Sequence, residues 1–151
     1  MYERDCGGVR VAFQMPLYPM IDNCDTDSSR NNHGLSWNTK RNHAAWELYL
    51  REVKGEVPPW AAPARQTDYS DLPPAYTFVG DSEPFYCETI AFVEALKKAG
   101  VEAAVDVYRT GFHAFDMLLP FLKISKEAAA TFEEQYLYAA EHYSAAQEDK
   151  A

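Results

Sequence analysis

Two side chains that could work together in acid–base chemistry follow two separate apolar stretches of the chain. Glu83 stands in GDSEPFYCE (80–88), and His113 stands in GFHAFD (111–116), two residues after a glycine. A carboxylate that accepts a hydrogen bond from one imidazole nitrogen sets the tautomer and leaves the other nitrogen basic. Such a pair is the orienting acid and the base of a nucleophilic triad.

Each of these residues also has an ordinary structural explanation. A loop histidine is commonly solvated or bonded to a carbonyl, and a glutamate near a helix start favours the helix dipole. Asp81 could be the carboxylate in place of Glu83, or it could cap the following helix. Pro84 suits the first turn of a helix and keeps Glu83 out of it, so we expect the Glu83 carboxylate to point along the sheet edge. Gly111 is expected to let the chain turn sharply before His113.

Three apolar segments have the patterns of strands. Residues 9–17 alternate apolar side chains, residues 75–80 form an apolar run bounded by proline and glycine, and residues 102–109 form the third. Helical spacing appears over about 39–53, over about 85–98 and from 125 onward. The side chains expected on the buried helix faces are Trp46, Tyr49, Leu50 and Val53, then Phe85, Thr89, Phe92 and Leu96, and finally Phe132, Tyr136, Ala139 and Tyr143.

The alternation of strands and helices predicts an α/β fold with a parallel sheet and helices on its faces. Ligands bind such sheets beyond the carboxyl ends of the strands. Glu83 follows the second predicted strand and His113 the third, so both are expected at that edge. We interpret residues 1–151 as a single domain with a proline-rich surface loop at 56–74 and a polar tail at 144–151.

Composition narrows the function classes. A chain of 151 residues that is 47% apolar can bury one hydrophobic core, and its net charge of 14 − 23 = −9 argues against nucleic-acid binding. No apolar run reaches the about 18 residues of a membrane span, and the start MYERDCGG lacks a signal-peptide pattern. Three widely spaced cysteines suggest neither a zinc site nor a disulfide framework. We expect a cytoplasmic protein with no membrane contact, no cofactor and no metal.

Several short motifs occur in an order that resembles the C-terminal part of α/β-hydrolases of the hormone-sensitive-lipase type (α/β-hydrolase fold-3). Over residues 72–116, LPPAYTFVG is followed by an acidic residue with proline, a helix ending in AGV, and a strand leading to GFHAFD. PLYPMID (16–22) and WNTKRNHAAWELYL (37–50) are similar to the family's segment after the nucleophile helix. The family cleaves short-chain acyl esters. The resemblance implies that Glu83 is the triad acid, where most members have aspartate, and that His113 is the base.

The nucleophile of that triad is not found in this sequence. The chain order of such triads places the serine before the acid, within G-x-S-x-G. The nearest string is GLSWN (34–38), where asparagine replaces the final glycine, so Ser36 keeps little of the motif. Ser28 and Ser29 lie in a polar loop, and CGGVR near the start is not the H-G-G-G motif that supplies oxyanion donors. We expect an esterase-family acid–base pair that is inactive alone or completed by another chain, acting then on a small acyl ester.

Two alternatives stay open. The chain could be a non-catalytic module that self-associates or binds a partner chain, because the edge of strand 9–17 would be exposed, long and apolar. It could also carry new chemistry on His113, Asp116 and Glu83 with a divalent ion, although these residues lack a short-range metal-ligand spacing. A hydrogen-bonded Glu83–His113 pair that opens on a cleft favours retained catalytic architecture, whereas splayed side chains favour drift away from it and so the binding module.

Overall fold

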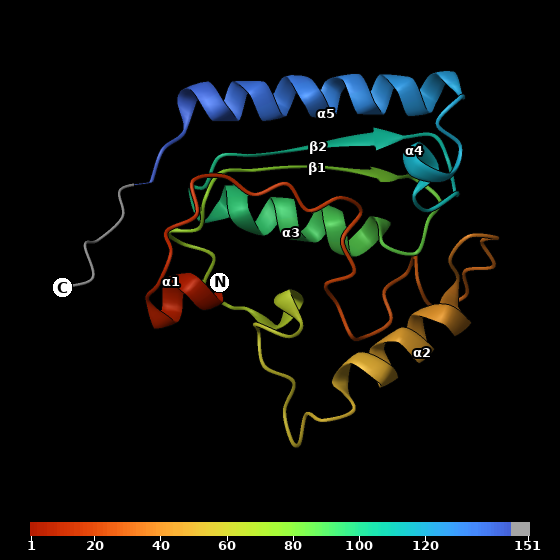
Figure 1. Cartoon of the computed structure of the whole chain (residues 1–151). Helices are drawn as coiled ribbons and strands as arrows, with labels where there is room; N and C mark the ends of the chain where they lie inside the picture. Colours follow the sequence, from red (N-terminus) through yellow and green to blue (C-terminus); the bar gives the residue numbers. More distant parts are fainter. Residues whose placement is uncertain (146–151) are drawn as a thin grey trace.

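The structure, a computed structural model, describes residues 1–145. Two parallel strands, β1 (Ala75–Gly80) and β2 (Ala103–Tyr108), lie between α3 (Tyr86–Lys98) on one face and α5 (Lys123–His142) on the other (Figure 1). The α/β class, the parallel pairing and the flanking helices predicted from the sequence are confirmed.

The central strand β1 is buried along its whole length, as its continuous apolar pattern predicts. Its bounds are the predicted 75–80, and β2 is one residue shorter at each end than the predicted 102–109. The ladder pairs Ala75 with Ala103 and Gly80 with Tyr108, so both strands end at the same level. The two turns that follow these strands therefore start side by side.

The predicted strand at 9–17 is wrong as a regular strand. The segment does run parallel to β1, but in the described part of the chain it forms only an isolated bridge between Gln14 and Ala75. Gln14 donates to the Pro74 carbonyl at 3.0 Å, and Tyr18 donates to the Phe78 carbonyl at 3.0 Å. The residue between them in the ladder is Pro16, which has no N–H to donate, so the ladder is interrupted there.

The helices keep their predicted places with changed bounds and faces. Helix α2 spans Thr39–Leu50, so Val53 lies outside it, and Trp46 is buried whereas Tyr49 is exposed. Helix α5 buries only small residues, Ser125, Ala128 and Ala139. Tyr136, which was expected on the buried face of this helix, is exposed.

The remaining elements are short: α1 (Tyr2–Cys6), a 3₁₀ turn η1 (Pro63–Arg65) and α4 (Phe115–Leu118). The 56–74 segment is irregular around η1, but it is more than a surface crossing because Ala61, Ala62 and Leu72 are buried. The single-domain interpretation stays a prediction, and residues 146–151 of the predicted tail lie outside the described residues. No helix within residues 1–145 is long and apolar enough to cross a membrane.

Candidate active site

Glu83 lies in the turn after β1 and is completely buried, with 0% of its surface exposed. Its carboxylate turns back toward its own strand: Oε1 accepts the Gly80 N–H at 2.8 Å, and Oε2 contacts His113 Nδ1 at 2.6 Å. One carboxylate oxygen therefore reaches along the sheet edge to the turn after β2, as expected, but the carboxylate is held by two partners and is not free. The turn also delays the helix, because α3 begins at Tyr86 and Pro84 precedes it rather than sitting in its first turn.

His113 lies in the turn after β2. Gly111 in the same turn was expected to allow a sharp bend, but the structure gives it a different role. Gly111 does not have a positive φ; the left-handed residue is Ala114, with φ of 58°. A Cβ at Gly111 would lie 3.3 Å from both Cβ and the carbonyl oxygen of Ser82. Gly111 is thus needed for close approach between the two turns, and not for a sharp bend.

Gly80 serves the same close approach from the other side. A Cβ on Gly80 would overlap the carbonyl oxygen of Thr110, which is main chain and cannot move aside cheaply. The same residue donates its N–H to Glu83. The two turns can approach each other closely because Gly80 and Gly111 have no side chains at the contact. This close packing places the Glu83 carboxylate beside the His113 imidazole.

We expect Gly80→Ala to destabilise the protein by about 2 kcal/mol because the added methyl overpacks this contact. The shift of the Gly80 amide should also change the NMR signals of the His113 ring. Gly55→Ala is the control, since that glycine has φ of 89° and open space around it. Both variants lose stability in urea unfolding, but only Gly80→Ala should alter the His113 signals; unchanged signals would contradict the packing argument.

The hydrogen-bond partners of the pair set the imidazole tautomer. The carboxylate of Glu83 accepts from Gly80 with one oxygen, and its other oxygen faces His113 Nδ1. Because a carboxylate has no hydrogen to give, Nδ1 carries a proton, and in the neutral imidazole Nε2 then carries the free lone pair. The His113 side chain is 18% exposed and its carboxylate partner is fully buried. This is the geometry that an orienting acid and a base adopt in a triad.

Three aromatic rings surround the His113 ring. The Tyr18 and Phe85 rings stand edge-on to it at centroid distances of 4.7 and 4.9 Å, and the Trp37 ring is tilted at 5.6 Å. Burial, together with the Asp116 carboxylate, raises the pKa of the Tyr18 phenol well above its usual range. None of Tyr18, Trp37 and Phe85 was predicted as a site residue. Tyr18 and Trp37 lie in the family-like segments 16–22 and 37–50, and Phe85 lies two residues after Glu83, so each carried a signal in the sequence.

The other candidates do not join the pair. Asp81 is exposed and accepts from its neighbour Ser82 at 2.9 Å, and Asp116 contacts Tyr18 rather than His113. Ser36 Oγ is buried and has no partner within the described residues, so it does not bond His113. No group of three or more His, Cys, Asp or Glu side chains among residues 1–145 could hold a metal.

The two serines of the polar loop have structural partners. Ser28 Oγ donates to the Pro84 carbonyl at 2.7 Å and accepts the Cys87 N–H at 3.0 Å. Ser29 Oγ accepts the Thr26 N–H at 2.8 Å. Ser28 therefore fixes the start of α3, close behind Glu83 in the chain, and neither hydroxyl is bonded to His113.

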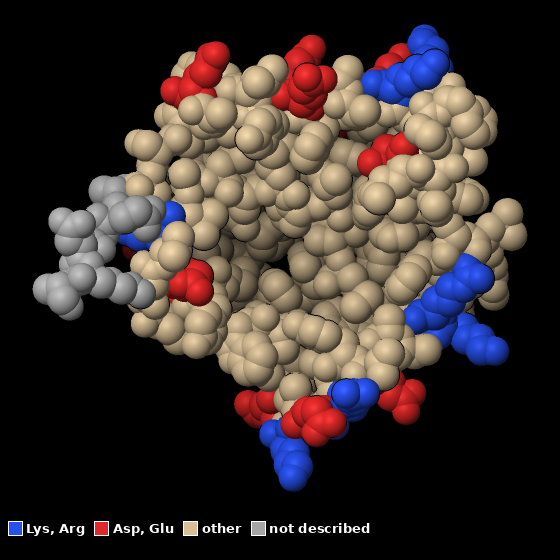
Figure 2. Space-filling view, in the orientation of Figure 1, with Lys and Arg blue, Asp and Glu red and all other residues tan. Residues whose placement is uncertain are grey.

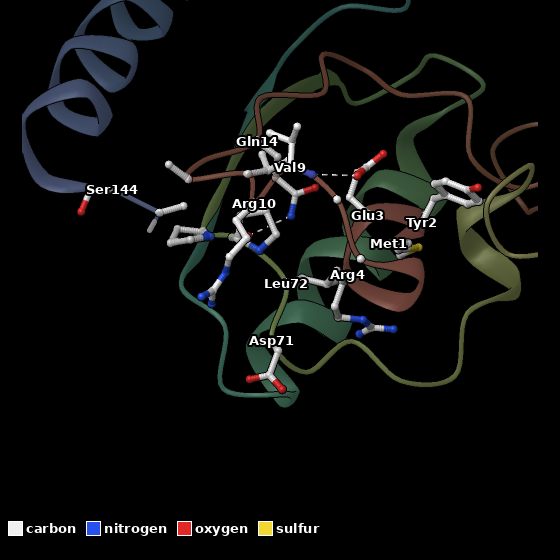
Figure 3. Close-up of a pocket in the computed structure, with 17 residues that line it drawn as sticks. Met1, Tyr2, Glu3, Arg4, Val9, Arg10, Gln14, Asp71, Leu72 and Ser144 are labelled. Atoms are coloured by element: carbon white, nitrogen blue, oxygen red, sulfur yellow. Dashed lines mark hydrogen bonds between the residues drawn. The ribbon is translucent and has the colours of Figure 1, made fainter. Parts of the chain in front are cut away.

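The cavities lie elsewhere on the molecule. The larger, about 1290 Å³, is at the amino ends of the strands and is lined by α1, by residues 9–12 and Gln14, and by the loop before β1 (Figure 3). The smaller, about 410 Å³, lies beside α3 and is lined by Asp22 and Glu88 among others. Neither cavity includes Glu83 or His113 in its wall. The pair does not open on either cavity, and the part of it that reaches the surface is the 18% exposed His113 side chain.

Comparison of the sequence with known protein families identifies the family to which this chain belongs. The profile of the alpha/beta hydrolase fold family matches residues 1–117. The chain belongs to the alpha/beta hydrolase fold family. Esterase LipI of Mycobacterium tuberculosis is 31% identical over 115 residues, which cover 74% of this chain and 36% of LipI.

Solved structures of the family agree with this fold. Esterase LipW from Mycobacterium marinum matches with a TM-score of 0.80 at 25% identity, over 85% of this chain and 41% of that chain. An esterase from the bacterial hormone-sensitive lipase (HSL) family matches with a TM-score of 0.76 at 29% identity, over 87% and 45%. The predicted resemblance to hormone-sensitive-lipase-type esterases is confirmed. The chain spans about a third of the length of the curated relatives it matches.

Proposed function

We propose that this chain supplies the acid and the base of a carboxylic ester hydrolase that acts on small acyl esters. The observation that carries the proposal is the Glu83–His113 contact of 2.6 Å, with the second Glu83 oxygen held by a main-chain N–H. Membership of a family whose named relatives are esterases supports the same chemistry. The serine and the oxyanion donors would come from a segment outside these 151 residues, in the same polypeptide or in a partner chain.

In this mechanism His113 Nε2 removes the proton from the serine hydroxyl as the oxygen attacks the ester carbonyl. Glu83 holds Nδ1–H and stabilises the imidazolium that forms, without itself taking the proton. The imidazolium then gives its proton to the departing alcohol, and water repeats the cycle on the acyl-enzyme. The aromatic ring of Tyr18 packs against the imidazole and limits its rotation.

The test combines the purified chain with the part of LipI that this chain does not match, which would provide the serine. Methyl butyrate is the substrate, because its alkoxide leaving group needs a complete triad. We expect hydrolysis in the mixture that His113→Gln reduces by about 10³-fold or more. Hydrolysis that survives His113→Gln, or no hydrolysis from a mixture that light scattering shows to be a 1:1 complex, would overturn the proposal.

The cellular setting belongs to the same proposal. Cys6, Cys24 and Cys87 are all free thiols, which is the usual state in a reducing compartment. This supports the expected cytoplasmic location.

Self-association is the second candidate function, and the free edge of the 9–17 segment favours it. In the described part of the chain no main-chain hydrogen bond joins Phe13, Met15 or Leu17 to another residue. Val9 and Val11 are exposed on the same segment. Figure 2 shows the face seen in Figure 1, with charged side chains around its rim and an uncharged, hollowed centre. From Val11 to Leu17 the segment has no charged residue. An unpaired edge of this kind is a site for pairing with another chain.

For this second candidate we expect light scattering at high micromolar concentration to give a mass above the monomer's 17.1 kDa. Val11→Lys should shift the mass toward the monomer, because a charge on the edge opposes strand pairing. Leu137→Lys on α5, an equally exposed apolar position, is the control and should leave the mass unchanged. A strictly monomeric wild-type chain would exclude self-association.

A further inference from the structure

We propose that His113 is itself an acyl acceptor, so that this chain hydrolyses activated esters through its imidazole without a serine. Glu83 holds the proton on Nδ1, and both Glu83 oxygens are already occupied by donors. The lone pair is therefore fixed on Nε2, and histidine is a competent nucleophile in covalent catalysis. The side-chain hydrogen-bond partner of His113 within residues 1–145 is Glu83 at Nδ1, and no serine hydroxyl there is bonded to the imidazole.

The leaving group decides the substrate class. Imidazole displaces a phenolate, which is a weak base, far more readily than an alkoxide. The ring surfaces of Tyr18, Phe85 and Trp37 around the imidazole leave 18% of the His113 side chain accessible. Little room at the nucleophile favours a short acyl group. The expected substrates are aryl esters of small carboxylic acids, and alkyl esters are excluded.

The reaction balances without a further reagent. The Nε2 lone pair forms a bond to the ester carbonyl carbon, and the bond from that carbon to the aryl oxygen breaks with release of aryloxide. The acyl-imidazolium keeps its Nδ1–H on the Glu83 carboxylate, whose negative charge offsets the new positive charge. Water then attacks the acyl carbon, the bond to Nε2 breaks, and the carboxylic acid leaves. The sum is ester plus water giving acid plus phenol.

A second histidine–carboxylate pair in the same molecule supplies the matched control. His43 Nε2 contacts Asp25 Oδ1 at 2.7 Å, and the His43 side chain is 58% exposed. Its carboxylate partner is partly exposed, whereas Glu83 is fully buried and held by a main-chain N–H. If accessibility alone governed acyl transfer, His43 would react faster than His113. If a fixed tautomer governs it, His113 reacts faster.

The experiment follows p-nitrophenolate release from p-nitrophenyl acetate by the purified chain. We expect His113→Gln to lower the rate above background by at least about tenfold, since it removes the nucleophile. His43→Gln and Ser36→Ala should leave the rate unchanged. Glu83→Gln keeps the imidazole but loses the tautomer control, so its rate should also fall. Urea unfolding of each variant verifies that the fold is intact.

Three results would overturn the proposal. One is a rate that survives His113→Gln in a folded variant. Another is a rate that Ser36→Ala abolishes, because the nucleophile would then be a serine. The third is hydrolysis of methyl butyrate by the chain alone, which imidazole does not achieve. Mass spectrometry of the quenched reaction should find the acetyl group on the peptide that contains His113, and hydroxylamine should remove it.

This activity shares the Glu83–His113 pair with the proposed triad but does not need the serine-bearing segment. Aryl-ester turnover with no alkyl-ester turnover in the mixture would support imidazole acyl transfer and remove the triad proposal. Alkyl-ester turnover in the mixture, with no aryl-ester turnover by the chain alone, would support the triad proposal and remove imidazole acyl transfer.

Discussion

Replacing Glu83 by Gln will lower alkyl-ester hydrolysis by the serine-completed enzyme by about 10³–10⁴-fold, although the side chains have nearly the same shape. Both Glu83 oxygens face N–H donors, from Gly80 and from His113. An amide has one oxygen, so its NH₂ group must face one of these donors. Turned toward His113, the NH₂ forces the proton onto Nε2 and removes the base; turned toward Gly80, it opposes a main-chain N–H in a buried site.

The tautomer can be read directly by NMR. In the wild-type chain the ring nitrogens of His113 should show a proton on Nδ1, and Glu83→Gln should move part of the population to the Nε2–H form. Asp81→Asn is the matched control, because this exposed carboxylate is two residues away and bonds only Ser82 among the described residues. A Glu83→Gln enzyme with wild-type rate and tautomer would show that the carboxylate does not orient the base.

The second large effect concerns Glu88, which the sequence analysis did not single out. Its Oε1 accepts the N–H groups of Ile21 and Asp22, at 2.6 and 3.2 Å, while its buried Oε2 has no partner in the described part of the chain. Burial raises the pKa of this carboxyl from 4.5 to about 7, although the two main-chain hydrogen bonds oppose the rise. The nearby Asp22 and Glu83 charges add to it.

A raised carboxyl pKa makes the folded state bind a proton more tightly than the unfolded chain does. The stability that Glu88 contributes is therefore greatest below about pH 4.5, falls as the pH rises toward about 7, and is constant above that. The difference amounts to about 3 kcal/mol between the two plateaus. Urea unfolding of the wild type and of Glu88→Gln at several pH values between 5 and 8 (about one unit apart) measures it.

Glu88→Gln should unfold with a pH dependence reduced by this amount, and it should be the more stable protein at pH about 8. Glutamine resembles the protonated carboxyl, so it keeps the acceptor for Ile21 without a buried charge. Glu94→Gln on the exposed side of α3 is the control and should follow the wild type. Identical pH profiles for the wild type and Glu88→Gln would contradict a buried, proton-binding Glu88.

Local sequence patterns were sufficient to predict β1 and β2, the strands that precede Glu83 and His113. The continuous apolar run of β1 has its predicted bounds because a strand covered on both faces needs apolar side chains at every position. Helix α3 ends as expected before Gly100, whose φ of 81° suits the residue after a helix. Because both strands are parallel, their carboxyl ends meet, and the sequence alone brought Glu83 and His113 together.

Other features depended on tertiary packing. Pro16 interrupts the ladder beside β1 only because its missing N–H faces that strand, and the orientation of a residue toward a neighbouring strand is not a local property. Trp37 contacts His113 from a segment that lies more than 70 residues earlier in the chain, and no local pattern predicts that contact. The requirement for glycine at positions 80 and 111 also comes from tertiary packing, because each residue lies against the opposite turn.

The sequence by itself therefore determined the fold class, the two paired strands and the placement of Glu83 and His113 after them, because the pattern of apolar residues and the chain order predict buried parallel strands. The tertiary structure alone decided that Glu83 is held from two sides, that three aromatic rings surround His113, and that Glu88 is buried with a raised pKa. These depend on contacts between segments far apart in the chain, which no local pattern of side chains encodes.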